Sequence, residues 1–163
     1  MIRIPLRPLA RILRRAWPMV DPERIEAAAM AEIALDASQA MTPDKARDLA
    51  LFAHASMAAL QRGEATEVDA NNLALISNVA LLLAEIGYGL EALPEIQAGQ
   101  LAANGVRLRQ LRTGRAVATG PELQALRELI SIHDQQLQLQ PTGAQMTAVI
   151  AELRRRMADG EVM

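Results

Sequence analysis

The chain lacks cysteine entirely and has very few aromatic side chains. Without cysteine it can form no disulfide, no thiolate metal site and no cysteine nucleophile. Aromatic residues are 2% of the 163 residues, namely Trp17, Phe52 and Tyr88, although hydrophobic residues are 51%. The core must therefore be built from Leu, Ile, Ala, Val and Met, a composition that suits close-packed helices better than strands.

No segment alternates polar and apolar residues with the period of two that a half-buried strand requires, so we expect no sheet. Helix-start signals recur instead, each with a capping side chain or an early proline. These signals begin at Asp21, Thr42, Thr66, Leu93, Thr119 and Thr142. They predict six helices, over about residues 22–39, 43–62, 66–86, 94–111, 120–140 and 142–158.

The third of these helices is the most apolar stretch of the chain. Between Leu73 and Ile86, apolar residues point around almost the whole helix circumference, which is typical of a helix wrapped by its neighbours. The apolar run is too short for a membrane span, which requires about 20 residues. The expected fold is therefore all-α: a compact bundle of about six helices around this central helix, in one domain over residues 21–160.

The first 20 residues form a separate region, which we expect to be a basic amphipathic arm. Residues 1–16 hold five arginines and no acid, whereas residues 17–106 hold thirteen acids against four basic residues. Arginines interrupt any apolar core of a secretory signal, so we expect a cytoplasmic protein. One side of the arm carries Arg11, Arg14 and Arg15, and the other ends in Trp17. Docking on the acidic body, on this subunit or a neighbour's, is the interpretation we favour over membrane or nucleic-acid binding.

A second group of arginines crowds the end of the fourth predicted helix, and a third group lies at residues 154–156. Cations at a helix C-terminus complement the helix dipole, which is one explanation for both groups. The alternative is an anionic partner. The candidate partner-binding residues are then those of the arm, Arg11, Arg14, Arg15 and Trp17, together with Arg107, Arg109, Arg112 and Arg115.

Two histidines, His54 and His133, are the only ones in the chain. His133 and Asp134 form the HD pair found in metal-dependent phosphohydrolases, and His54 could supply a third ligand. A metal site of that kind needs more ligands than these three residues offer. His133 also continues an apolar seam with Leu126, Ile130 and Leu137, where a packed imidazole is the commoner occupant. We therefore assign no metal, no cofactor and no catalytic residue.

Several motifs between His54 and Leu137 resemble a group of small helical proteins. They are HASMAALQRGEATEVDANNLALISNVALLLAEIGYG, then LPEIQAGQLA, then TGPELQALRELISIHDQQL. The group is encoded by proteobacterial phages, prophages and plasmids and has no established activity. The resemblance implies an accessory gene of a mobile element, whose products often bind host proteins or regulate element genes.

Three functional hypotheses follow. The leading one is a non-enzymatic accessory protein that acts by protein–protein contact, with an unidentified partner and as a homodimer. The first alternative is a nucleic-acid-binding regulator that uses the arginine-rich segments. The second is a metal-dependent hydrolase centred on His54, His133 and Asp134.

Overall fold

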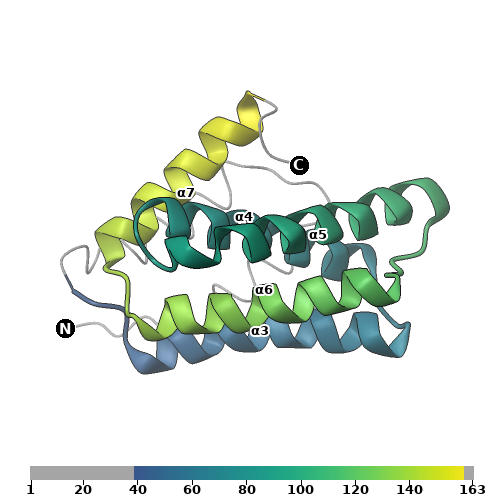
Figure 1. The fold of residues 1–163 in the computed structure, drawn as a ribbon, viewed down its shortest axis with the longest axis horizontal. Coiled ribbons are helices and arrows are strands. Elements are labelled where there is room, and N and C mark those ends of the chain that lie inside the picture. The colour runs from purple at the N-terminus through teal and green to yellow at the C-terminus, as the bar shows by residue number, and fades with distance from the viewer. Residues whose placement is uncertain (1–38, 160–163) are drawn as a thin grey trace, which may run out of the picture.

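The computed structural model describes residues 39–159, and these residues are all-helical (Figure 1). The elements are α3 (Pro43–Arg62), α4 (Glu67–Glu85), the short 3-10 helix η2 (Leu90–Ala92), α5 (Leu93–Thr113), α6 (Gly120–Gln138) and α7 (Gly143–Ala158). The five α-helices match the five that capping signals predict in this part of the chain. The predicted helix at residues 22–39 and the arm at residues 1–20 lie outside the described residues.

Four of the five α-helices begin at a capping threonine, as the sequence predicts. Thr42, Thr66, Thr119 and Thr142 accept hydrogen bonds from backbone N–H groups of the first turns of α3, α4, α6 and α7. In α4, α6 and α7 a reciprocal bond completes a capping box, because the side chain of the third helical residue accepts a hydrogen bond from the backbone N–H of the threonine. These caps satisfy donors that a helix start otherwise leaves unpaired.

The connection between α4 and α5 is a turn that contains two glycines, whose position after the apolar run predicts the end of α4. Gly87 and Gly89 both adopt left-handed backbone angles, with φ of 103° and 82°. Glycine adopts these angles without the steric cost that a Cβ would add. The η2 turn follows directly and redirects the chain into α5.

α4 contacts each of the other four described α-helices, as well as η2. Its Leu73 and Ala80 are fully buried in a cluster that includes Ile96 of α5 and Leu126 and Leu129 of α6. α3 and α6 lie side by side along one edge of the molecule (Figure 1). The main core therefore lies among α3, α4, α5 and α6.

Three buried polar side chains make α4 less uniformly apolar than the sequence pattern suggests. Asn72 donates to Ser56 Oγ on α3 at 2.9 Å, and Ser77 donates to the Ala74 carbonyl at 2.7 Å. Asn78 accepts from Gln100 Nε2 on α5 at 2.6 Å. These bonds pair the Asn72 amide nitrogen, the Ser77 hydroxyl and the Asn78 amide oxygen, whose burial would otherwise be costly, and two of the bonds join α4 to a specific neighbour.

α7 packs on α4 through a smaller cluster of Leu82, Leu83, Val149 and Leu153. Leu75 and Val79 of α4 pack against the same cluster and are half-buried. None of the helices in residues 39–159 is both long enough and apolar enough to cross a membrane.

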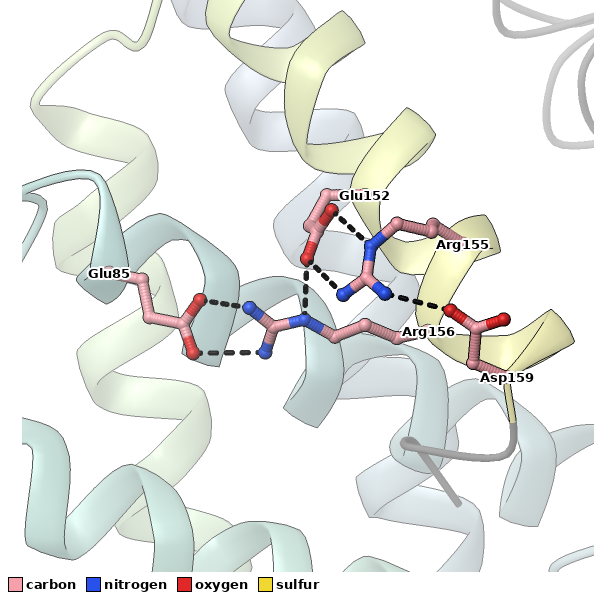
Figure 2. Close-up of polar contacts among 5 residues, drawn as sticks. All are labelled: Glu85, Glu152, Arg155, Arg156 and Asp159. Atoms are coloured by element: carbon pink, nitrogen blue, oxygen red, sulfur yellow. Dashed lines mark hydrogen bonds and ion pairs between the residues drawn. The ribbon is translucent and has the colours of Figure 1, made fainter.

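An ion-pair network also joins these two helices (Figure 2). Arg156 of α7 donates to both carboxylate oxygens of Glu85 on α4, with an Nη1–Oε1 distance of 2.9 Å. Glu152 accepts from Arg155 and Arg156, and Arg155 also pairs with Asp159. Hydrogen bonds from the two guanidinium groups lower the pKa of Glu152 to about 2. Arg155 and Arg156 therefore pair with acids within the fold.

Candidate protein-interaction surface

α5 has one inner face of small residues that packs into the bundle. Ile96, Gly99, Ala102, Ala103 and Val106 are buried there. A Cβ placed on Gly99 would lie 2.5 Å from Leu129 Cβ, so the absence of a side chain lets α5 approach α6 closely. This inner face fixes the rotation of α5 about its own axis.

The opposite face of α5 exposes large apolar side chains. The exposed fractions are 67% for Leu101, 43% for Leu108 and 58% for Leu111. Because these residues are spaced by seven and three, they lie on one side of the helix. We call Leu101, Leu108 and Leu111 the α5 leucine stripe. Leu108 and Leu111 are neighbours on the helix surface, and Leu101 lies two turns before Leu108 on the same side. Single exposed leucines are normal on protein surfaces, whereas several on one side of a helix indicate a site of interaction.

The α5 leucine stripe was not predicted from the sequence. The signal that could have found it is that α5 is apolar on two sides. Ile96, Ala103 and Val106 share one phase of the 3.6-residue period, and the stripe occupies the other. Because the small residues pack more closely on a neighbouring helix, they face inward and leave the leucines outside.

The predicted arginine cluster at the end of α5 divides into two pairs. Arg107 donates to Asn71 Oδ1 on α4 at 3.1 Å, and Arg109 donates to the Val117 carbonyl and to Glu122. Burial raises the pKa of Glu122, but hydrogen bonds from Thr119 and Arg109 outweigh this effect and lower it overall. Arg107 and Arg109 thus stabilise the fold.

Arg112 and Arg115 are exposed; Arg112 follows Leu111 in α5, and Arg115 lies just beyond the end of the helix. Arg112 Nε donates to the carbonyl of Leu108 in its own helix at 3.3 Å. Gly114, in the left-handed conformation with φ of 71°, ends α5 between these two arginines. The exposed end of α5 is therefore both apolar and basic. The other predicted partner-binding residues, Arg11, Arg14, Arg15 and Trp17, lie outside the described residues.

The three candidate metal ligands do not converge on one point. His54 Nε2 lies 2.8 Å from Asp134 Oδ2, and this pair joins α3 to α6 near the surface. His133, although adjacent to Asp134, is buried and forms its hydrogen bond with Gln136. Within residues 39–159 no group of three or more histidine, aspartate and glutamate side chains is placed to hold a metal ion.

The neighbours of His133 determine which nitrogen carries its proton. Gln136 Nε2 donates to the carbonyls of Ala80 and Tyr88, at 2.9 and 2.8 Å, so its Oε1 is the acceptor. His133 Nδ1, at 3.4 Å from that oxygen, must therefore be the donor. Burial lowers the pKa of His133 and keeps the ring neutral, which identifies it as a packed structural side chain.

A pocket of about 320 Å³ lies beside the Asp134 carboxylate, between the start of α3 and the end of α6. Its lining is mostly apolar or amide, with one carboxylate and one guanidinium: Pro43, Ala46, Arg47, Ala50, Asp134, Leu137, Gln138 and Gln140. These residues include no serine, threonine, histidine or lysine, and the one carboxylate, Asp134, is paired with His54 of α3.

Comparison of the chain with known proteins gave no match among protein-family models, curated proteins or solved structures.

Proposed function

We propose that this chain is a non-enzymatic, all-α accessory protein of a mobile genetic element that acts by binding another protein. The observation that carries this proposal is the α5 leucine stripe, which leaves three large apolar side chains in water on a helix whose other side is fully packed. The origin in a mobile element rests on the resemblance of residues 54–137 described above.

The division of the arginine cluster favours a protein partner over nucleic acid. Two of the four guanidinium groups at the end of α5 bond to acceptors within the fold. Arg112 and Arg115 remain exposed beside leucines. A mixed apolar and arginine surface is typical of protein interfaces, whereas duplex binding requires several phosphate contacts.

A capture experiment with matched variants tests the proposal. The full-length chain, affinity-tagged, is incubated with a lysate of the cells that carry the gene, to which an untagged copy of the chain has been added. Retained proteins are identified by mass spectrometry. The test variant is Leu101→Gln with Leu108→Gln, and the control is Leu51→Gln with Leu139→Gln, two leucines that are 58% and 62% exposed on α3 and at the end of α6.

We expect the wild type and the control to retain the same protein, and the stripe variant to lose it while keeping its circular dichroism spectrum. Equal retention by the stripe variant would reject the α5 leucine stripe as the binding surface. A salt-dependent gel shift that disappears in Arg112→Gln with Arg115→Gln, without any retained protein, would replace the proposal with nucleic-acid binding.

A further inference from the structure

The exposed apolar residues around α5 are arranged almost symmetrically about its centre. Leu101 and Leu108 lie at equal distances in sequence on either side of the midpoint between residues 104 and 105, and so do Ala98 and Leu111. Farther out, Leu90 precedes the helix and Val117 follows it, with 56% and 38% of their surfaces exposed. All six of these residues are exposed.

The exposed charges around α5 have the opposite property. Glu91 and Glu95 lie at its N-terminal end, and Arg112 and Arg115 at its C-terminal end, all exposed. The charge of these four residues is therefore negative before the midpoint between residues 104 and 105 and positive after it, and the apolar residues are arranged about the same midpoint. Arg107 and Arg109 do not disturb this pattern, because they bond within the fold.

Apolar symmetry combined with charge antisymmetry lets this surface complement itself in an antiparallel two-fold pair of identical chains. Such an interface uses one surface twice and must complement itself when it is rotated by 180°. In an antiparallel pair of α5 helices, Leu101 of one copy faces Leu108 of the other. The glutamates at one end then meet the arginines at the other, and the two helix dipoles oppose each other favourably.

A parallel pair is disfavoured by the same charges. It would place Glu91 and Glu95 beside their own counterparts and Arg112 and Arg115 beside theirs. Like charges across an interface oppose association. α5 has 21 residues and is about 30 Å long, enough for the stripe and both charged ends to meet a partner helix at once.

We infer that the partner bound by the α5 leucine stripe is a second copy of this chain, paired through antiparallel α5 helices. This inference rests on the proposed function, since it names the protein that occupies the surface. It specifies the contact as Leu101 against Leu108, with the acidic end of each α5 beside the basic end of the other.

Two measurements on the full-length chain test the inference. The first is the dissociation constant from sedimentation velocity over a range of concentrations. Each of Leu101→Gln and Leu108→Gln should weaken self-association by roughly tenfold or more, since each removes an apolar contact from the centre of the interface. Leu51→Gln should leave it unchanged. A charge reversal, Arg112→Glu with Arg115→Glu, should also weaken it, and adding Glu91→Arg with Glu95→Arg should restore it.

The second measurement uses the absence of cysteine to determine helix direction. Leu101→Cys and Leu108→Cys are prepared separately, mixed and oxidised under mild conditions. Antiparallel pairing predicts that the mixture forms disulfide-linked dimers faster than either variant alone. Leu51→Cys serves as the control for random collision.

Four results would overturn the inference. Faster disulfide formation by each variant alone than by the mixture would show parallel pairing. A dimer that is unaffected by the stripe variants would remove both this inference and the stripe from the proposed function. A monomer at all concentrations, with stripe-dependent capture of another protein, would reject self-pairing and leave the proposed function standing. A monomer whose thiol at position 101 is shielded from a labelling reagent would instead assign the stripe to a segment of the same chain.

Discussion

α4 and the outer face of α5 are both rich in leucine, but leucines that are buried in α4 have exposed counterparts on the outer face of α5. Leu73 and Leu83 of α4 are completely buried, whereas Leu101 and Leu111 of α5 are more than half exposed. The difference comes from the neighbours. α4 contacts four other helices, whereas α5 turns its small residues inward to α4 and α6. The same residue type thus stabilises the fold in one helix and remains exposed to solvent in the other.

The largest test of this contrast is removal of one leucine from each helix. Leu73→Ala should lower the free energy of unfolding by about 2–5 kcal/mol, because it leaves a cavity in the main core. Leu101→Ala should change it by no more than about 0.5 kcal/mol at low protein concentration. Urea denaturation followed by circular dichroism measures both. An equally large loss for Leu101→Ala would show that the stripe is packed within the folded monomer.

The inner face of α5 gives the next largest effect. Gly99→Ala should destabilise the fold, because the new methyl group would lie 2.5 Å from Leu129 Cβ. If the helices cannot separate, overpacking of this kind costs about 1–3 kcal/mol of folding free energy. Replacing a glycine within a helix by alanine gains only roughly 0.8–1 kcal/mol, so the cost should outweigh the gain.

Gly120→Ala is the matched control, since Gly120 begins α6 and has open space around it. It should be neutral or slightly stabilising in the same denaturation experiment. If Gly99→Ala behaved like this control, α5 would have room to move away from α6, and the orientation of the leucine stripe would be less firmly fixed.

His133 provides a test by pH. Burial lowers its pKa in the folded protein, whereas the unfolded chain takes up a proton near pH 6.5. As the pH falls below about 6.5, the unfolded state therefore binds the extra proton first and stability is lost, by at most about 1.4 kcal/mol per pH unit. The loss stops once the pH passes below the folded pKa.

His133→Asn removes this titration and can keep a donor toward Gln136 Oε1. The wild type should therefore lose more stability than this variant between pH 7.5 and 5.5, as measured by urea denaturation. His133→Leu should cost about 1–3 kcal/mol at pH 7.5, because it leaves that buried oxygen without its donor. Parallel pH profiles for the wild type and His133→Asn would contradict the assignment of a neutral buried imidazole.

The smallest effect is expected at the junction of α4 and α7. Glu85→Gln breaks the charge pairing with Arg156, whose side chain is 21% exposed, while that of Glu85 is 38% exposed. Because water screens such a pair, the loss should be about 0.2–1 kcal/mol and should shrink at high salt. A loss that is large and independent of salt would show that α7 depends on charge rather than on its apolar cluster.

The elements of the fold that sequence predicted well are those determined by neighbours in the chain. Thr66 with Asp69, and Thr119 with Glu122, mark helix starts because the capping bonds span only three residues. The burial of His133 followed from its position on the α6 seam. The buried polar bonds of α4 could not be predicted, because Asn72 and Ser56 meet only after α3 and α4 have packed.

The candidate site was harder to predict for a related reason. Four arginines close together in sequence suggested one basic surface, but Arg107 and Arg109 find acceptors on other parts of the fold. Which acceptor lies within reach depends on the packing of α4, α5 and the start of α6. The exposed leucines could not be predicted for the same reason, because composition does not show which of two apolar faces of α5 packs inward.

The double donation by Gln136 has a consequence for how the molecule opens locally. Its amide holds the Ala80 carbonyl within α4 and the Tyr88 carbonyl in the turn that follows. If that turn separates from the bundle, either the hydrogen bond from the Gln136 amide to the Tyr88 carbonyl breaks or α6 moves together with the turn. Amide hydrogens around the turn, which would exchange quickly in an isolated surface loop, should therefore exchange together with those of α6. In Gln136→Leu, exchange around the turn should accelerate while the middle of α6 stays protected.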